Sequence, residues 1–463
     1  MRAYDVIIVG TGPAGIFAGL ELAASKKLKV LMIDKGRDIK KRICPVKDKK
    51  HKCIRCNVCS IVSGWGGSGA FSDGKLTLSP DVGGLLDRYI SKDELNSWID
   101  YVDKKYIQFG APEEIYGTDL QAIQELQRKT SLALLKFIPY SIRHLGTGRS
   151  AIVLERMADW LKNSVDIQME TAVTELIVED NKIKGVVTDK GERISAKYVI
   201  VAPGREGAEW LAKEARRLKM ASAINPVDIG VRVELPAAIM EPITDMVYEA
   251  KLIFYSKSFD DKVRTFCMCP HGEVVVENND GLATVNGHTH AEKKTDNTNF
   301  ALLVSKTFTE PFKDPISYGR YVAGLANLLG GGVMVQRLGD LISGRRSTPE
   351  RINKGIVNPT LKEATPGDLS LVFPYRHLIS ILEMLEALDK IAPGVYSHST
   401  LLYGVEVKFY SSRLVTTEKL ETEIHNLFSI GDGAGITRGL MQASISGAIS
   451  AREILAREGE RSD

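Results

Sequence analysis

Residues 10–15 constrain the fold of this 463-residue chain more than any other feature, because they place a glycine fingerprint between an apolar strand and an alanine-rich helix. The strand is expected over residues 4–10 and the helix over residues 13–25, and a second apolar strand over residues 29–34 completes a βαβ unit. The first glycine permits a tight turn, the second lets a pyrophosphate approach the backbone, and the third allows close helix packing. The segment therefore predicts a dinucleotide site at Gly10, Gly12, Pro13, Ala14 and Gly15.

An acidic residue ends the second strand, as such a site requires. Asp34 stands 19 residues after Gly15, where a carboxylate can bind a ribose hydroxyl. The N-terminus of the intervening helix offers N–H groups and a partial positive charge to the pyrophosphate. We include Lys35, the next residue, in the predicted site. The alternative is a glycine turn without a ligand.

The far end of the chain distinguishes FAD from NAD, which both use this fingerprint. Residues 429–435, Ser-Ile-Gly-Asp-Gly-Ala-Gly, resemble a second motif of flavoproteins, whose Gly-Asp carboxylate binds the ribityl chain. The following helix, expected over residues 437–457, would point its N-terminus at the flavin pyrimidine. Residues 198–204 resemble the segment that passes over the nucleotide in the same superfamily. The FAD site is thus predicted to include Val173, Ala202, Pro203, Gly204, Gly431, Asp432 and Gly433.

Internal motifs carry a resemblance to a family. The sequence Gly-Trp-Gly-Gly-Ser-Gly-Ala-Phe-Ser-Asp-Gly-Lys-Leu at 64–76, the sequence Phe-Cys-Met-Cys-Pro at 266–270 and the Gly431 turn resemble the prokaryotic FAD-dependent (NAD(FAD)-utilising) dehydrogenases, over most of the chain. That family resembles single-Rossmann flavoproteins such as geranylgeranyl reductases and hydroxybenzoate hydroxylase. The resemblance implies that residues 66–75, with Gly67, Ser68 and Gly69, lie near the isoalloxazine ring. It implies no substrate.

The order of elements predicts an α/β protein that consists of a Rossmann-like FAD-binding domain with a β-meander and an inserted α+β substrate domain. The FAD domain is expected to be discontinuous, over 1–80, 145–222 and 411–463, with a cysteine loop at 44–59. Residues 81–144 are expected to form a helical segment, and residues 223–410 the substrate or cap domain. No second strand, fingerprint and helix unit occurs, so a separate NAD(P)H domain of the glutathione reductase kind is not expected.

Charge and hydropathy limit the classes of partner and the cellular location that we expect. The chain holds 61 Lys or Arg and 58 Asp or Glu, a formal charge of +3, so bulk charge gives no argument for nucleic acid or a membrane surface. The longest apolar stretches, such as residues 325–335, are broken by glycines and fall short of the ~20 residues that cross a bilayer. The N-terminus lacks the pattern of an export signal. We expect a cytoplasmic protein with a small-molecule substrate, no nucleic-acid partner and no transmembrane segment.

Four cysteines form a candidate metal site. Cys53, Cys56 and Cys59 have Cys-x2-Cys-x2-Cys spacing, and Cys44 precedes a proline. Ferredoxins hold clusters on such a triplet and a separated Cys-Pro, although here the fourth cysteine lies upstream. A 4Fe–4S cluster is our leading interpretation, and a zinc ion held by four thiolates or free thiols are the alternatives.

Residues 37–55 around these cysteines hold nine Lys or Arg and two Asp, a net charge of +7 by count. A solvated basic loop is the ordinary explanation. The functional explanation is a docking site for an acidic electron carrier such as ferredoxin, because complementary charge steers the encounter of two proteins. The sequence does not decide between such a carrier and NAD(P)H as electron donor.

The expected substrate domain carries further candidates. Cys267, Cys269 and His271 recur at period two, as do His288 and His290, so each set should share one face of a strand. A second metal site or a redox dithiol would be alternatives, but residues i and i+2 of a strand lie roughly 6.5–7 Å apart at Cα, near the limit for a disulfide. We expect Cys267 and Cys269 to line the substrate chamber instead.

Arginines beside glycine turns are candidate anion binders, although surface arginine is the commoner explanation. Arg438 has the best case, because the start of the last helix should lie near the flavin edge. It is our third catalytic candidate after the two cysteines, and we assign no acid or base. The other arginines of this kind are Arg149, Arg205 and Arg337.

These features predict an FAD-dependent oxidoreductase, a dehydrogenase or reductase, that transfers hydride or electrons between flavin and an organic substrate. Reduction of a carbon–carbon double bond with a ferredoxin-like donor is the version we favour. The alternatives are an FAD-dependent monooxygenase and a flavin and iron–sulfur module that relays electrons without its own small-molecule substrate. The long insert favours an enzyme, because a relay hardly needs a second domain.

Overall fold

The computed structural model describes residues 2–45, 54, 56–72, 74–146, 148–223, 225–279, 281–289, 294–309, 311–312, 314–408 and 413–459. The chain divides into two compact units: unit 1 comprises residues 1–114, 142–225 and 410–463, and unit 2 comprises residues 115–141 and 226–409. The segment 81–144 is shared between them, because its helix α2 (Lys92–Gln108) is part of unit 1 and its helix α3 (Leu120–Leu132) is part of unit 2.

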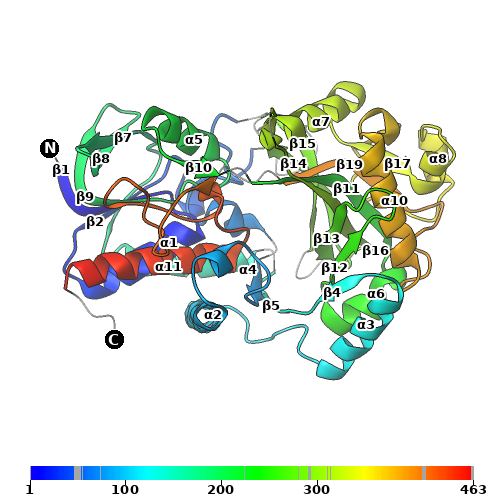
Figure 1. The fold of residues 1–463 in the computed structure, drawn as a ribbon, viewed down its shortest axis with the longest axis horizontal. Helices are drawn as coiled ribbons and strands as arrows, with labels where there is room; N and C mark the ends of the chain where they lie inside the picture. The colour runs from blue at the N-terminus through cyan, green and yellow to red at the C-terminus, as the bar shows by residue number, and fades with distance from the viewer. Residues whose placement is uncertain are drawn as a thin grey trace. The chain divides into compact units, whose positions relative to one another are not determined.

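Unit 1 is built on a seven-stranded sheet in the order β6-β2-β1-β9-β8-β7, with β21 also paired to β9 (Figure 1). Strands β6, β2, β1, β9 and β21 are parallel, and β7 and β8 continue from β9 as an antiparallel meander. The strands are β1 (Arg2–Val9), β2 (Val30–Ile33), β6 (Asp166–Gln168), β7 (Val173–Glu179), β8 (Lys182–Thr188), β9 (Arg193–Val201) and β21 (Leu427–Ser429). The predicted Rossmann-like core with a β-meander is therefore confirmed.

The sequence explains this core, because near-continuous apolar strands are typical of parallel sheets covered on both faces. All four residues of β2 are buried. Helices α1 (Pro13–Ser25) and α11 (Leu440–Arg457) pack against each other (Figure 1). A Cβ on Gly447 would lie 2.0 Å from the carbonyl oxygen of Ala14, so these helices approach too closely for any larger residue there. Helix α11 begins at Leu440, three residues later than expected.

The remaining elements of unit 1 are short or peripheral. They are α4 (Arg149–Leu161), α5 (Ala208–Arg217), the strands β3 (Lys75–Leu78), β5 (Ser141–His144), β10 (Ser222–Ala223) and β20 (Arg413–Leu414), and the 3-10 helices η1 (Ile39–Lys41), η2 (Gly67–Phe71), η3 (Leu86–Arg88) and η5 (Asp432–Ala434). Helix α4 is amphipathic: its buried residues include Val153, Leu154, Met157 and Leu161.

Unit 2 is built on an eight-stranded sheet in the order β18-β17-β19-β11-β16-β13-β12-β4, antiparallel except for β17 with β18. Residues 227–235 of β11 are all buried, so the sheet is covered on both faces there. Strand β4 comes from a stretch expected to be helical and pairs with β12. The strands are β4 (Lys136–Ile138), β11 (Val227–Pro236), β12 (Lys251–Tyr255), β13 (Lys262–Cys269), β16 (Asn297–Lys306), β17 (Met334–Arg337), β18 (Thr365–Pro366) and β19 (Leu401–Lys408).

A hairpin and several helices complete unit 2, in agreement with the α+β class expected for the insert. The hairpin is β14 (Glu273–Asn279) with β15 (Leu282–His288), and the helices besides α3 are α6 (Ala237–Val247), α7 (Pro315–Gly330), α8 (Leu338–Ile342), α9 (Pro349–Asn353), α10 (Tyr375–Asp389) and the 3-10 helix η4 (Leu369–Leu371). Within the described ranges of both units, no helix has the length and apolar character needed to cross a membrane.

Candidate functional site

The glycine fingerprint forms a turn whose shape excludes side chains. Gly10 follows β1 with a φ of +104°, and a Cβ there would lie 2.1 Å from the carbonyl oxygen of Ala202. A Cβ on Gly15 would lie 2.0 Å from the carbonyl oxygen of Gly10. Gly12 precedes α1 without a side-chain cap, which leaves the N–H groups of Ala14 and Gly15 for a phosphate. The turn therefore fits a dinucleotide in the way that the fingerprint predicts.

Asp34 is held beside this turn. Its Oδ2 accepts hydrogen bonds from the backbone N–H (2.8 Å) and the hydroxyl (2.9 Å) of Thr11, and its Oδ1 accepts one from the N–H of Gly36 (2.8 Å). Each carboxylate oxygen has two lone pairs, so Oδ1 keeps one for a ribose hydroxyl. Lys35 instead forms an ion pair with Glu206, with Nζ 3.1 Å from Oε1.

The predicted second motif meets the first at the same edge of the sheet. Gly431 has a φ of +77°, and a Cβ there would lie 3.1 Å from the Cβ of Ala14. A Cβ on Gly433 would lie 2.1 Å from the carbonyl oxygen of Gly204. Segments that follow β1, β9 and β21 therefore converge at the carboxyl ends of parallel strands, which is where nucleotides bind in this fold class.

Asp432 lies in η5 and is oriented by its neighbours. Its Oδ1 accepts hydrogen bonds from the hydroxyl of Thr437 (2.7 Å) and the N–H of Gly439 (3.3 Å), and its Oδ2 pairs with Nε of Arg205 at 3.2 Å. Arg205, a predicted anion binder, thus pairs with a carboxylate of the candidate site itself. The second lone pair of Oδ2 remains for a ligand hydroxyl.

A contact at the start of α11 was missed by sequence reasoning. The Gln442 side chain accepts a hydrogen bond from the N–H of Leu86 (3.2 Å) and donates one to the carbonyl of Val82 (3.3 Å), while the N–H of Arg438 donates to the carbonyl of Gly83 (2.8 Å). These bonds tie the segment before α11 to the loop ahead of η3. The glycine pair at 83–84 was the available signal, because it permits this close approach.

The segment with Gly67 is joined to the fingerprint by Arg42, which we had counted only as part of the basic loop. The N–H of Gly66 donates to the carbonyl of Thr11 (2.7 Å), and a Cβ on Gly67 would lie 3.3 Å from the Cα of Gly12. The Arg42 guanidinium is buried and donates hydrogen bonds to four carbonyl oxygens. Its acceptors are Ser60 (2.9 Å), Ile61 (2.7 Å), Trp65 (2.5 Å) and Gly67 (2.9 Å).

The other residues predicted for FAD also lie in unit 1. Ser68 and Gly69 are in η2, and the carbonyl of Gly69 accepts a hydrogen bond from the Ser150 hydroxyl (2.8 Å). Val173 begins β7 and is buried, and Pro203 follows β9.

The cysteine loop is described only in part. Cys44 and Cys59 are half-buried and Cys56 is exposed, whereas Cys53 lies outside the described residues. In the part of the chain that the structure describes, no group of three or more His, Cys, Asp or Glu could hold a metal ion. Neither an iron–sulfur cluster nor zinc gains support, and the four-cysteine site stays a prediction.

Part of the positive charge of the basic loop is already paired or buried. Arg37 lies 3.4 Å from Glu170 and Lys40 lies 3.1 Å from Glu155, while Arg42 faces backbone carbonyls. The net charge counted from the sequence therefore overstates what an acidic carrier would meet.

The cysteine candidates of unit 2 do not follow the regular alternation we expected. A register shift between Phe266 and Cys269 interrupts β13, and the Sγ atoms of Cys267 and Cys269 lie 3.9 Å apart. The Nδ1 of His271 lies 3.0 Å from the carbonyl oxygen of Thr295. His288 ends β15, and His290 lies outside the described residues.

The remaining arginine candidates have ordinary places in the fold. Arg149 is the first residue of α4, and Arg337 ends β17 and donates a hydrogen bond to the carbonyl of Arg351 (2.8 Å).

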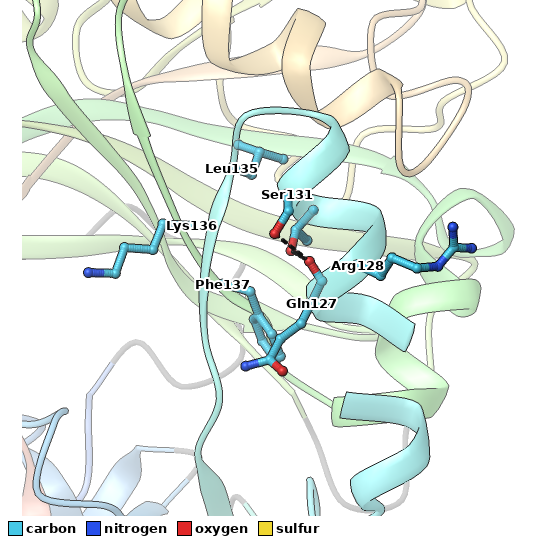
Figure 2. Close-up of a pocket in the computed structure, with 7 residues that line it drawn as sticks. Gln127, Arg128, Ser131, Leu135, Lys136 and Phe137 are labelled. Carbon is cyan, nitrogen blue, oxygen red and sulfur yellow. Dashed lines mark hydrogen bonds between the residues drawn. The ribbon is translucent and has the colours of Figure 1, made fainter. Parts of the chain in front are cut away.

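A pocket of about 370 Å³ lies between α3 and β4 in unit 2 (Figure 2). The Ser131 hydroxyl in its wall donates to the carbonyl of Gln127 (2.8 Å). The pocket is lined by Gln127, Arg128, Thr130, Ser131, Leu135, Lys136 and Phe137. It contains none of the predicted cofactor or catalytic residues, so we assign it no function.

Two family models match adjacent parts of the chain. Residues 226–409 match the model described as "FAD-dependent protein, C-terminal domain-like". Residues 149–224 match the model described as "Glucose inhibited division protein A". An uncharacterized protein of Clostridium beijerinckii is 28% identical over 481 residues, which cover 97% of this chain and 80% of the relative.

Solved structures with a similar chain path include two oxidases and a reductase-like protein. Formate oxidase of Aspergillus oryzae has a TM-score of 0.48 at 14% identity, with 99% of both chains covered. Glycine oxidase of Geobacillus kaustophilus has a TM-score of 0.41 at 12% identity, with 100% of this chain and 96% of that chain covered. A geranylgeranyl bacteriochlorophyll reductase-like protein of Thermoplasma acidophilum has a TM-score of 0.37 at 13% identity, with 99% and 80% covered. At these values the likenesses carry no argument about substrate or reaction.

The family matches agree with the geometry of unit 1. The fingerprint turn, Asp34 and the Gly431 segment form a dinucleotide cradle, and the models that match residues 149–409 support the predicted resemblance to FAD-dependent families. The chain is thus similar to an FAD-dependent protein family over residues 226–409, and unit 1 supplies a fold and a cradle that fit a dinucleotide.

Proposed function

We propose that this protein is an FAD-dependent oxidoreductase that transfers hydride or electrons between bound FAD and an organic small molecule. The observation that carries the proposal is the convergence of the Gly10 turn, Asp34 and the Gly433 turn at one edge of the parallel sheet. FAD, when bound, supplies the capacity to take up and release two electrons. Unit 2 supports an enzyme rather than a carrier, because it is a second folded unit with its own core.

The residues of unit 1 would hold the cofactor in complementary ways. The first N–H groups of α1 bind the pyrophosphate, because they have no partner within the helix and carry its positive end. Asp34 accepts a hydrogen bond from a ribose hydroxyl through Oδ1, and Asp432 accepts one from the ribityl chain through Oδ2. The N-terminus of α11 stabilises negative charge at the flavin pyrimidine.

The reaction we favour is reduction of a carbon–carbon double bond, with electrons from an acidic carrier of the ferredoxin type. The support for this electron donor is the sequence of the cysteine loop, in which Cys44, Cys53, Cys56 and Cys59 are a candidate ligand set among basic residues. Such a loop would bind the carrier, and a cluster on these thiolates would pass electrons inward.

The experiment begins with protein isolated without oxygen. Its absorption spectrum, with assays of iron, sulfide and zinc, tests the cofactor and metal expectations together. The flavin is then reduced and offered unsaturated ketones, unsaturated acids and quinones in turn. Reoxidation by one of these classes would support the proposal. Reoxidation only by protein carriers would favour a relay, and NAD(P)H oxidation coupled to oxygen uptake would favour a monooxygenase.

Asp34→Ala tests the cofactor site directly. It removes the acceptor of three hydrogen bonds beside the fingerprint, so we expect purified protein with little FAD. Asp5→Ala is the matched control, because Asp5 is a carboxylate in the middle of β1, away from the fingerprint, that accepts a hydrogen bond from the N–H of Lys29 (2.7 Å). Equal FAD content in both variants would contradict the assignment.

A further inference from the structure

Strand β13 contains an irregularity that brings two cysteine side chains together. Phe266 pairs with Ala301 and Cys269 pairs with Asn299, so β13 has one residue more than β16 over this stretch. Cys267 occupies the bulge with a φ of +45°, a conformation that a residue with a side chain adopts at a cost. In a regular strand these two cysteines would be held near the limit for a disulfide, whereas here their Sγ atoms are 3.9 Å apart.

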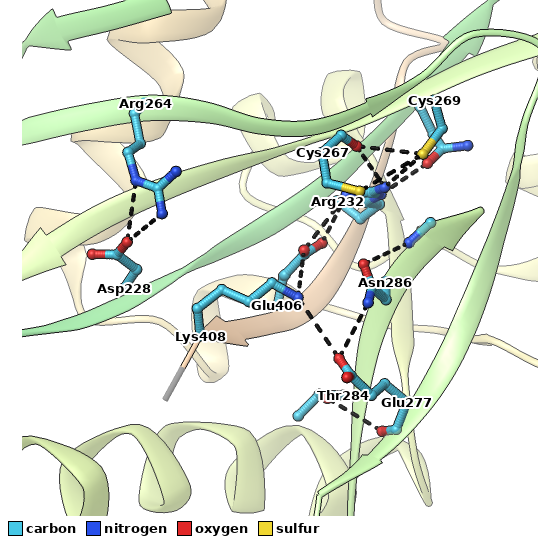
Figure 3. A network of polar contacts seen from close by, with 12 residues as sticks. Asp228, Arg232, Arg264, Cys267, Cys269, Glu277, Thr284, Asn286, Glu406 and Lys408 are labelled. Atoms are coloured by element: carbon cyan, nitrogen blue, oxygen red, sulfur yellow. Dashed lines mark hydrogen bonds and ion pairs between the residues drawn. The ribbon is translucent and has the colours of Figure 1, made fainter. Parts of the chain in front are cut away.

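A buried cation lies against this pair. Arg232 on β11 is fully buried, and its Nη2 donates hydrogen bonds to the carbonyl oxygen of Cys267 (2.8 Å) and to Sγ of Cys269 (3.4 Å) (Figure 3). Its Nε donates to Oδ1 of Asn299 (2.8 Å). A Cβ on Gly287 of the neighbouring hairpin would lie 1.8 Å from Nη2, so only glycine lets β15 pass over the guanidinium. The fold thus holds one orientation of Arg232, with a positive charge next to sulfur.

Other charges near the pair form a chain with alternating signs (Figure 3). Nη1 of Arg232 lies 3.4 Å from Oε2 of Glu406, and Lys408 lies 3.1 Å from Glu406 and 3.7 Å from Glu277. Burial lowers the pKa of Arg232, but the charges of Glu406 and the two cysteines raise it more, so the net pKa lies above its ordinary value and the guanidinium stays protonated. A protonated arginine within hydrogen-bond distance of sulfur stabilises the thiolate.

Further titratable groups near this end of β13, among the described residues, include His271, Glu241, His288 and Glu273, which pairs with His288 in the hairpin. His271 follows two residues after Cys269, with Nε2 3.8 Å from Glu241 of α6. A Cβ on Gly272 would lie 2.4 Å from the carbonyl oxygen of His288 and 2.8 Å from Cβ of Cys269, which places the backbone of His288 close by.

We propose that Cys267 and Cys269 are a thiol–disulfide exchange site of unit 2, with low-molecular-weight disulfides as its substrates and Arg232 as the positioning residue. Cys267 is only partly buried and Cys269 is fully buried, so Cys267 is the thiol that an external disulfide reaches first. The Cys267 thiolate attacks one sulfur of the external disulfide, which forms a mixed disulfide and releases one thiolate. The Cys269 thiolate, stabilised by Arg232, then attacks the Cys267 sulfur, which closes the internal disulfide and releases the second thiolate.

This exchange is balanced. The two protein thiols lose two electrons and two protons, and the external disulfide gains both pairs to become two thiols. Closing the bond requires the sulfurs to move from 3.9 Å to about 2.05 Å. The inference rests on unit 2 alone, so it stands or falls independently of the flavin reaction.

Mass mapping after oxidation tests the proposal. Reduced protein with FAD bound is exposed to bis(2-hydroxyethyl) disulfide without oxygen, then digested with trypsin. The sequence contains no Lys or Arg between Arg264 and Lys293, so both cysteines fall in one peptide. We expect that peptide to lose the mass of two hydrogen atoms and to regain it with dithiothreitol. Cys269→Ser should accumulate a mixed disulfide at Cys267, and Cys267→Ser should react slowly.

Several results would overturn the proposal. One is that the wild-type peptide keeps both thiols after Cys56, an exposed cysteine, has reacted. Another is a peptide with two mixed disulfides and no internal bond. The flavin spectrum of each variant, which reports on unit 1, should stay that of wild type.

The role of Arg232 is tested by the pH profile of disulfide closure. In Arg232→Lys a single nitrogen replaces the guanidinium, and it cannot contact Asn299, Glu406 and Cys269 at once as the three nitrogens of Arg232 do. The half-maximal rate should therefore move to higher pH, by about one unit or more. Arg264→Lys is the matched control, because Arg264 is a buried arginine of β13 that pairs with Asp228 (2.6 Å). An unchanged profile in Arg232→Lys, or an equal shift in both variants, would overturn this role. If Arg232→Lys does not fold, the wild-type profile still tests this role. Disulfide closure in the wild type only at the alkaline pH at which an ordinary thiol ionises would overturn it.

Discussion

Replacing Arg42 by Met separates a buried structural cation from the basic surface around it. The guanidinium donates hydrogen bonds to carbonyl oxygens of two short segments. Ser60 and Ile61 directly follow the cysteine loop, and Trp65 and Gly67 belong to the segment that meets the glycine fingerprint. Met has a similar length and no donor. The variant therefore leaves these carbonyls without their partner and loosens the position of Gly67 beside the FAD turn.

The magnitude follows from two opposing terms. Each carbonyl that loses its partner without gaining water costs about 1–3 kcal/mol. Burial lowers the pKa of Arg42 to about 10, although Asp34 and Cys59 raise it, and relief of this unfavourable burial returns about 3 kcal/mol in the variant. With four such carbonyls, we expect the free energy of unfolding of unit 1 to fall by about 1–9 kcal/mol, and FAD affinity to fall about tenfold or more.

Urea unfolding and FAD content measure both effects. Arg42→Lys should be intermediate, because an ammonium cannot reach all of the carbonyls at once. Lys40→Met is the control: Lys40 belongs to the same basic loop but is exposed beside Glu155, so its unfolding midpoint and FAD content should equal those of wild type. A wild-type unfolding midpoint with full FAD content in Arg42→Met would refute the reasoning.

Three further predictions concern other parts of the chain. Gly433→Ala places a Cβ 2.1 Å from the carbonyl oxygen of Gly204, so bound FAD, measured by absorbance, should fall to a small fraction of wild type. Burial, with Lys306 and Arg376 nearby, lowers the pKa of His377 from 6.5 to about 4. As the pH drops from 6.5 to 4, the imidazole is therefore protonated in the unfolded chain but not in the folded one, and the free energy of unfolding falls by up to about 1.4 kcal/mol per pH unit. Urea unfolding at several pH values should show a weaker acid dependence in His377→Phe. Arg143→Met removes the partner of Asp103, to which two nitrogens of Arg143 donate at 2.7 Å. The free energy of unfolding, measured by thermal unfolding, should fall by about 3–5 kcal/mol. A decrease smaller than a third of this would contradict a buried ion pair.

The backbone shape of the cradle proposed for FAD could be predicted, because its parts are local patterns. The positive φ of Gly10 and the close contact at Gly15 are backbone requirements that few residue types satisfy, so the sequence records them directly. Asp34 could be read from its spacing along one βαβ unit. The Gly431 segment is far away in the chain, and only its resemblance to a known motif connected it to the fingerprint.

Two other features could not be predicted, because they depend on contacts that no local pattern records. Arg42 has the same composition signal as the solvated lysines beside it, and its burial arises from carbonyls that lie 18–25 residues further along the chain. Strand β4 was expected to be helical, and its pairing with β12 joins residues more than a hundred positions apart.

The cysteine pair shows the same division most clearly. The sequence by itself determined that two cysteines lie in a strand-like segment with one residue between them. The regular alternation of a strand then predicts that they are too far apart for a disulfide bond. Only the tertiary structure shows that the two sulfurs lie 3.9 Å apart beside a buried cation. The extra residue in β13 is visible only against its partner β16, and the charge comes from Arg232, 35 residues before Cys267. Sequence records what one segment requires of its own backbone, whereas register and neighbouring charge are set by the segments that pack against it.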